Sequence, residues 1–263
     1  MHATLEPISP DLGVVASGFD LASDRSDDVR DQLLESVDRH HVVALPNQAL
    51  PPDAHVEVGQ WFGEPLIHPY LTAIDGHPEI LQVHKEPDDE ATFGGEFWHA
   101  DITFMAPPAS VSLLQSLVLP PIGGDTLFAN QHLALERLSP AFRSTLEGLR
   151  AVHVYPDKPE DDPHAVAVHP VVRRHPRTGR DALFVNPAFV QRFEGMTAAE
   201  SRPLLEQLFD HQVRPEFTCR VRWSPDMLLL WDNRSVLHYA MNDYFGHQRT
   251  LQRVMSMERT EAT

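Results

Sequence analysis

The segment MLLLWDNRSVLHYAMNDYFGHQRTLQRV, residues 227–254, carries the pattern that decides the fold. Its apolar run MLLLW predicts a buried strand, and Asp232 and Asn233 predict a turn directly after it. A second predicted strand follows and carries His238, and a third strand-like piece, LQRVMSM, begins at residue 251. Short strands joined by tight turns indicate a fold built mainly of β-structure.

Similar strand-like pieces recur outward from this segment. They are LGVVASG, VVALP, EILQV, SVSLLQSLVL, DTLFA, AVHVY, DALFV and FTCRVRW. Helices are fewer and are predicted over residues 26–40, 138–149 and 197–211, where Ser139 precedes Pro140 and where Thr197 and Glu200 form a capping box. Many short strands with few helices predict a mainly β fold with flanking helices (α+β), a sandwich or barrel rather than a parallel α/β sheet.

Composition excludes several classes of protein. The chain has 263 residues and a formal net charge of −17, so a nucleic-acid or anionic-membrane surface is not expected. The N-terminus has no signal-peptide pattern and no apolar run is long enough to span a membrane, which predicts a cytoplasmic protein. Cys219, the one cysteine, alternates with its neighbours as on a strand and is predicted to be a core residue.

The stretch EFWHADITF, residues 96–104, raises a chemical question because it sets His99 and Asp101 two residues apart among apolar neighbours. On a strand, residues i and i+2 point to the same face, so this pair can offer two adjacent ligands to one metal ion. A surface histidine beside a capping aspartate is the alternative interpretation. His238, 139 residues beyond His99, adds a third candidate. Two histidines and one carboxylate form the facial triad of non-haem Fe(II) oxygenases.

Five segments in order give a family resemblance. They are WHADITF, PPIGGDTLFAN, HPVVRRHPRTGRDALFVNPAF, WDNRSVLHYA and HQRTLQRV. The sequence resembles the taurine dioxygenase family of Fe(II)- and 2-oxoglutarate-dependent oxygenases from about residue 5 to residue 257. The resemblance implies a double-stranded β-helix (a cupin-like jelly-roll) in a single domain spanning residues 1–263. The polar, proline-rich segments 85–95 and 155–164 are expected as exposed loops, within active-site loops near 68–97 and 155–168.

The resemblance also assigns roles to particular residues. It implies that the iron ligands, which are also the catalytic residues, are His99, Asp101 and His238. It implies that Arg249 and Thr126 bind the distal carboxylate of 2-oxoglutarate, and a guanidinium fork suits that task. His68 and Arg253 match the residues that hold the anionic group of the substrate. Residues 249, 251 and 253 share one face of a strand, so both arginines are expected in one cavity.

The match to taurine-oxidising members ends around the other end of the substrate. Gly95 stands where they have an asparagine, Tyr155 where they have a phenylalanine, and Tyr70 is displaced, whereas Phe189 matches an aromatic wall residue. The expected substrate is therefore a small anionic molecule: an alkylsulfonate such as taurine, an alkyl sulfate or an aryloxyalkanoate. Hydroxylation with O2 at the carbon next to the heteroatom, releasing succinate and CO2, is the expected reaction.

Two other functions stay open from the sequence. One is a hydroxylase or desaturase of a biosynthetic intermediate, such as an amino-acid derivative, in the same fold. The other is a non-catalytic metal-binding jelly-roll. By analogy with the family, a homo-oligomer (dimer or tetramer) is expected. Other histidines are predicted mostly on surface segments: His40, His41, His132, His164, His211 and His247.

Overall fold

The structure, a computed structural model, describes residues 3–91, 96–156, 158 and 161–258. Within these residues the largest sheet has nine strands in the order β1-β2-β3-β15-β7-β17-β6-β5, with β4 paired to β17. We call it the main sheet. Its strands are β1 (Thr4–Pro7), β2 (Val14–Ser17), β3 (Val42–Leu45), β4 (Glu64–Pro65), β5 (Ala73–Ile74), β6 (His77–Lys85), β7 (Ala109–Val118), β15 (Leu228–Asp232) and β17 (Arg249–Met257).

A second, three-stranded sheet packs against the inner face of the main sheet. Its order is β14 (Thr218–Val221), β8 (Thr126–Asn130), β16 (Val236–Ala240). Strand β15 shows why two layers form: Leu229 and Trp231 enter the core between the sheets, whereas Leu228 and Leu230 point to the opposite face. Because side chains alternate along the strand, the two faces of β15 are buried in two different parts of the core. These two packed sheets, antiparallel except for the parallel pair β2 and β3, are the jelly-roll that the resemblance implied, and that prediction is confirmed.

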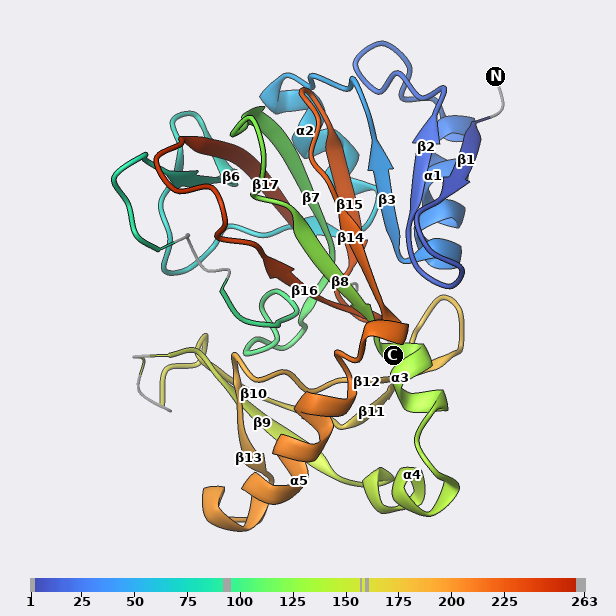
Figure 1. Ribbon diagram of the computed structural model, residues 1–263, viewed down its shortest axis with the longest axis vertical. Helices are drawn as coiled ribbons and strands as arrows, with labels where there is room; N and C mark the ends of the chain where they lie inside the picture. The colour runs from blue at the N-terminus through green and yellow to red at the C-terminus, as the bar shows by residue number, and fades with distance from the viewer. Residues whose placement is uncertain (1–2, 92–95, 157, 159–160, 259–263) are drawn as a thin grey trace.

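Two helices cover the outer face of the main sheet. They are α1 (Asp27–His40) and α2 (Pro52–Gln60) (Figure 1). Leu33 and Val37 of α1 and Val58 of α2 are buried in one cluster with the outward residues of β3, β7 and β15. The helix α1 was predicted from sequence over nearly the same residues, and its apolar residues three and four positions apart explain this packing.

The remaining elements form a layer at the lower end of Figure 1. Its helices are α3 (Gln131–Glu136), α4 (Pro140–Leu146), α5 (Ala198–His211) and the short 3-10 helix Pro215–Phe217; its strands are β9 (Arg150–Val154), β10 (Val166–Pro170), β11 (Val172–Arg174), β12 (Asp181–Leu183) and β13 (Val190–Phe193). The predicted capping box is confirmed, because Thr197 accepts from the backbone N–H of Glu200 while the Glu200 side chain accepts from the N–H of Thr197. One buried cluster joins α3, α5 and β13.

The strand β17 follows every other described strand of the main sheet in sequence and nevertheless lies inside it. It pairs with β7 on one side and β6 on the other, both antiparallel. Arg249 and Arg253 therefore sit within the sheet and not at its edge. Leu251, between them, is fully buried in the inter-sheet core, which fixes the inward face of this strand.

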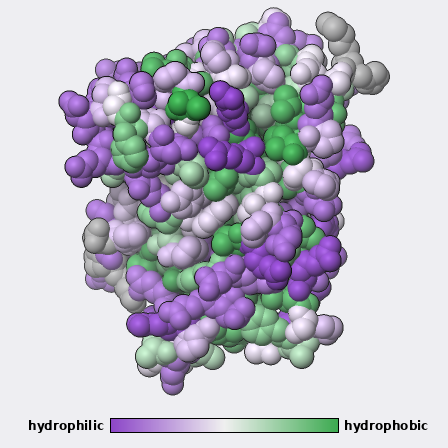
Figure 2. Space-filling view, in the orientation of Figure 1, coloured by the Kyte–Doolittle hydropathy of each residue, from purple (hydrophilic) through white to green (hydrophobic). Residues whose placement is uncertain are grey.

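The surface is largely hydrophilic on the face that Figure 2 draws. Figure 2 shows a face on which hydrophilic residues predominate and hydrophobic ones are scattered. No helix among the described residues is both long and apolar enough to cross a membrane. Cys219 is buried as predicted, and burial raises the pKa of its thiol to about 12.

The surface prediction for the additional histidines is wrong at three positions. His41, His132 and His211 are buried, whereas His164 and His247 are exposed and His40 is half-buried. The buried rings find acceptors inside the protein: His132 Nδ1 donates to the carbonyl of Asp181, and His211 Nε2 to that of Ala134. A histidine ring can be buried when its polar nitrogens find hydrogen-bond partners. Hydropathy along the sequence does not reveal these partners.

Candidate active site

The segment 96–104 is not a strand, and this prediction is wrong. His99 instead forms an isolated antiparallel bridge with His238, and the two backbone N–H groups donate to each other's carbonyls at 3.0 and 2.7 Å. The chain then turns from Asp101 to Phe104, with Ile102 at φ 56°. His99 and Asp101 still converge, but a bridge followed by a turn brings them together instead of the alternation of a strand.

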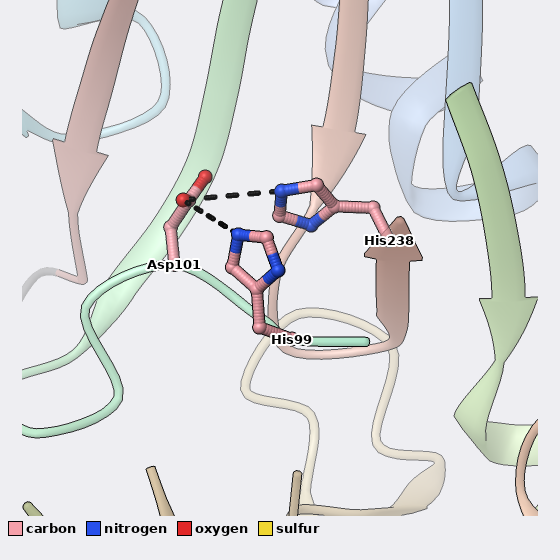
Figure 3. A group of neighbouring side chains, drawn as sticks. All are labelled: His99, Asp101 and His238. Carbon is pink, nitrogen blue, oxygen red and sulfur yellow. Dashed lines mark ion pairs between the residues drawn. The ribbon is translucent and has the colours of Figure 1, made fainter. Parts of the chain in front are cut away.

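Three side chains meet at this point, as Figure 3 shows. The Oδ1 atom of Asp101 lies 3.9 Å from Nε2 of His99 and 3.9 Å from Nε2 of His238. All three side chains are buried, and their ligand atoms lie within 4.8 Å of one another. Atoms that bind one ion at about 2 Å lie at most about 4 Å apart. The two 3.9 Å separations therefore fit a single metal ion.

The protonation of the three groups suits a cation. Burial lowers the pKa of His99 and of His238, so both imidazoles are neutral at pH 7. Burial alone raises the pKa of Asp101, but the charge of Arg253, the two neighbouring imidazoles and the hydrogen bond from Ser112 outweigh it and lower that pKa to about 2. His99 Nδ1 donates to the carbonyl of Phe97 at 2.9 Å, which leaves the lone pair on Nε2 facing Asp101. Neutral imidazoles and a carboxylate are what a divalent metal requires.

A closed ring of hydrogen bonds holds Asp101. Ser112 Oγ donates to Asp101 Oδ2 at 2.6 Å, and Asn233 Nδ2 donates to Ser112 Oγ at 2.9 Å. Asn233 Oδ1 in turn accepts from the backbone N–H of Asp101 and from Trp231 Nε1, both at 3.0 Å. We call Ser112 and Asn233 the carboxylate brace. It occupies Oδ2 and leaves Oδ1 directed at the histidines.

Arg253 contacts the other oxygen of the same carboxylate. Its Nη1 donates to Asp101 Oδ1 at 2.8 Å. The Nε atom is buried and has no hydrogen-bond partner in the part of the chain that the structure describes. The guanidinium therefore lies beside the candidate metal position with donor capacity left over.

A cavity of about 320 Å³ opens on this cluster. Two regions of its wall differ in character. The metal end consists of His99, Asp101, His238, Thr126 and Arg249. The aromatic end consists of Phe97, Phe104, Tyr155 and Phe189. His68 and Arg253 line the cavity as well, so the structure gathers most of the predicted site residues around one space.

Thr126 and Arg249 are arranged as donors at the metal end. Arg249 is buried, with its guanidinium carbon 5.6 Å from the ring centre of Trp223 and 5.9 Å from that of Tyr244. Thr126 Oγ1 accepts from Trp223 Nε1 at 3.1 Å, so its own hydroxyl hydrogen stays available. A planar guanidinium and a free hydroxyl can together bind one carboxylate.

The predicted substrate residues are placed less uniformly. His68 is buried and its Nδ1 accepts from the backbone N–H of Tyr70, so Nε2 carries the proton. Burial and the charge of Arg253 lower the pKa of His68 to about 4, against the effect of Asp101. Tyr70 does not line the cavity; its hydroxyl donates to Asp162 at 2.8 Å and its ring packs on Tyr155. Gly95 lies outside the described residues.

A second group of possible ligands has a structural explanation. Asp38, His175 and Asp232 also lie close together. Arg234 donates to both oxygens of Asp232 at 2.8 and 2.6 Å, and Arg177 binds Asp38. Burial raises the pKa of Asp232, but Arg234 and His175 lower it further than burial raises it. These carboxylates are already neutralised by arginines and do not need a cation.

Sequence reasoning missed the carboxylate brace. Asn233 was assigned only to a turn, although an asparagine directly after a buried strand and five residues before a ligand histidine is a usable signal. Ser112 gave no signal, because it is one of several small residues in a long apolar strand.

The jelly-roll and this cavity define a dioxygenase, an oxidoreductase class, and comparison with known proteins identifies the family. The family model described as taurine catabolism dioxygenase TauD, TfdA family matches residues 4–255. The chain belongs to this family. It is 32% identical to an alpha-ketoglutarate-dependent sulfate ester dioxygenase of Pseudomonas putida, over 97% of this chain and 89% of that one.

Two further relatives broaden the comparison. An alpha-ketoglutarate-dependent 2,4-dichlorophenoxyacetate dioxygenase of Cupriavidus pinatubonensis is 36% identical over 63% of this chain and 61% of its own. The crystal structure of a taurine dioxygenase from Burkholderia xenovorans superposes with a TM-score of 0.86 at 36% identity, covering 98% of this chain and 90% of that one. The predicted family and enzyme class are confirmed.

Proposed function

We propose that the protein is an Fe(II)- and 2-oxoglutarate-dependent dioxygenase that hydroxylates a small organic anion at the carbon next to its heteroatom. One observation carries the proposal: the ligand atoms of His99, Asp101 and His238 converge in a cavity that is also lined by the buried Arg249 and the partly buried Arg253. Three convergent metal ligands and two cations have no structural reason to share a cavity.

In this proposal His99, Asp101 and His238 would hold the iron, and 2-oxoglutarate and O2 would be the co-substrates. Bound iron supplies the oxidation, in which the substrate gains a hydroxyl group while 2-oxoglutarate is converted to succinate and CO2. The carboxylate brace keeps Asp101 in place, and burial keeps both imidazoles neutral and able to bind. Arg249 and the hydroxyl of Thr126 bind the far carboxylate of 2-oxoglutarate.

Arg253 and His68 hold the anionic group of the substrate. Arg253 supplies the positive charge, and its buried Nε, which has no hydrogen-bond partner among the described residues, can donate to an oxygen of the substrate. His68 is neutral at pH 7 and contributes a hydrogen bond from Nε2. Since Arg253 also donates to Asp101 Oδ1, its position ties the substrate's anion to the metal end.

The aromatic end favours a substrate with an apolar tail. Phe104 lies 4.6 Å from Tyr155 and 5.0 Å from Phe189 between ring centres, so three rings form one wall. Among the described residues that line the cavity, Asp101 is the only carboxylate, and no acidic group is left for a substrate ammonium. This supports an alkyl sulfate with an apolar tail, or an aryloxyalkanoate, over taurine, in keeping with the sulfate ester and phenoxyacetate relatives.

The test of the metal and co-substrate is spectroscopic. Under anaerobic conditions, Fe(II) and 2-oxoglutarate together should give the wild-type protein a weak visible charge-transfer band. The band should be absent in His99→Ala and present in His40→Ala, which removes a half-buried histidine on α1. A wild-type protein without the band would refute the proposal.

The substrate class is tested by succinate formation with taurine, an alkyl sulfate, an aryl sulfate and an aryloxyacetate. We expect an apolar-tailed anion to stimulate succinate formation most, and the stimulation to be lost in Arg253→Leu. Equal stimulation by an uncharged aryl alcohol would show that the anion is not what Arg253 recognises. A cytoplasmic location, the single domain, and a dimer or tetramer stay predictions.

A further inference from the structure

Lys85 is an unusual residue at the end of β6. The chain has only two lysines, Lys85 and Lys158, and uses arginine for its other cations. Lys85 is 2% exposed, and its Nζ has no hydrogen-bond partner among the residues that the structure describes. Burying an ammonium without a counter-charge is costly, so a lysine in this position calls for an explanation.

The register of the main sheet places Lys85 next to the co-substrate residues. Lys85 is the direct antiparallel partner of Arg249, and residues opposite each other in such a pair project from the same face. Both cations approach the ring of Tyr244: Lys85 Nζ lies 5.0 Å from its centre and the Arg249 guanidinium carbon 5.9 Å. A side-chain hydrogen bond also links Tyr244 to Arg249.

The acidic groups around Tyr244 already have partners of their own. Asp125 accepts from Arg220 at 2.6 Å, Asp243 from the backbone N–H of Gly124 at 2.7 Å, and Glu96 from Asn242 at 2.7 Å. None of these carboxylates hydrogen-bonds to Lys85. Lys85 does not line the cavity itself, so its positive charge stays uncompensated next to Arg249 until an anion binds there.

We propose that Lys85 is a second cation for the far carboxylate of 2-oxoglutarate, acting together with Arg249. This inference rests on the proposed function, which brings that carboxylate to Arg249. Two positive charges on one face of the sheet favour a dicarboxylate over a 2-oxo acid that carries a single carboxylate. The unfavourable burial of Lys85 is relieved only when the dicarboxylate binds. Lys85 therefore lowers the stability of the ligand-free protein and raises its affinity for 2-oxoglutarate.

The experiment measures binding of 2-oxo acids to Mn(II)-loaded protein by calorimetry, which needs no turnover. We compare 2-oxoglutarate with 2-oxobutyrate, which lacks the second carboxylate. Lys85→Met should weaken 2-oxoglutarate binding by about tenfold and 2-oxobutyrate binding by less than about threefold. Lys158→Met, which removes the other lysine, should change neither value.

Stability gives an independent readout. Without ligand, Lys85→Met should unfold at the same temperature as the wild type or a higher one, while the stabilisation produced by saturating 2-oxoglutarate should be smaller. Lys85→Gln keeps a similar length without the charge and provides the same comparison if the methionine variant does not fold.

The outcomes separate this inference from the proposed function. If wild-type protein does not bind 2-oxoglutarate, the proposed function itself fails. If wild-type protein binds it and both Lys85 variants bind it equally well, or lose affinity for both acids alike, the role of Lys85 is overturned and the proposed function stands.

Discussion

The two ends of the active-site cavity are built by different physical means. At the metal end, hydrogen bonds fix two of the three ligand side chains: Asp101 is held by Ser112 and Arg253, and His99 by the carbonyl of Phe97. At the aromatic end the side chains contact one another through ring packing, as Phe104 does with Tyr155 and Phe189. Hydrogen bonds have direction and fix positions, whereas apolar contacts tolerate changes of shape.

This difference suggests that the two ends of the cavity serve different parts of the reaction. A rigid metal end supports a reaction that stays the same, and an adaptable aromatic end can accept different organic tails. Changes at the metal end should therefore affect metal or 2-oxoglutarate binding whatever the substrate. Changes at the aromatic end should affect the substrate alone.

The largest effect is expected for Arg249→Met. Removing the guanidinium leaves the far carboxylate of 2-oxoglutarate without its main partner, which should raise the Kd for 2-oxoglutarate about 100-fold or more. The measurement is calorimetric titration of the Mn(II)-loaded protein. Arg222→Met, which removes an exposed arginine just after β14, is the matched control and should bind as the wild type does. Unchanged affinity in Arg249→Met would break the assignment of the metal end.

A smaller effect is expected for the carboxylate brace. Asn233→Ala removes the acceptor of the Asp101 backbone N–H and the donor to Ser112, so metal affinity should fall by about 10- to 100-fold. Metal titration checks this without turnover. Ser112→Ala should act in the same direction, and the double variant should lose less than the product of the two single losses, because both residues belong to one network. If the fold-loss of affinity in the double variant equals the product of the two single fold-losses, the brace does not act as a unit.

At the aromatic end we expect a still smaller and more selective effect. Phe189→Ala removes one ring of the wall and should weaken binding of an apolar-tailed substrate by about tenfold. The Kd for 2-oxoglutarate should stay unchanged. A change in 2-oxoglutarate binding of similar size would contradict the separation of the two ends.

An effect of similar size, on stability and not on binding, is expected for histidines that serve the fold and lie away from the cavity. Burial lowers the pKa of His55 to about 4, although a hydrogen bond to the carbonyl of Leu113 opposes this. The unfolded chain therefore takes up a proton first as pH falls below 6.5, and stability declines between pH 6.5 and about 4. Each such histidine should cost about 1.4 kcal/mol between pH 7.5 and 5.5.

Chemical unfolding of metal-free protein at the two pH values measures this decline. In His55→Leu the decline should be smaller by about 1.4 kcal/mol, since one such imidazole is gone. An equal decline in both proteins would show that His55 is not responsible.

The sequence predicted the metal end better than the aromatic end, for identifiable reasons. Strand alternation was enough to put Arg249 and Arg253 in one cavity, because β17 pairs with β6 without a register shift over residues 249–254. The spacing of His99 and Asp101 fits a strand and a turn equally well, and nothing in the residue types announced the left-handed backbone at Ile102. No local pattern predicts the burial of four other residues, because their neighbours in the structure are far away in sequence. These residues are Ser112, Lys85, His41 and His132.

The position of β17 has a consequence for how the protein is made. The strand emerges from the ribosome after all the other described strands of the main sheet, yet its place is between β6 and β7. Until it arrives, the nascent chain carries two strands with unpaired edges, which are sites of aggregation. Arg249 and Arg253 arrive on the same strand. A chain that ends shortly before residue 249 would therefore lack both an inner strand of its main sheet and its two cavity arginines.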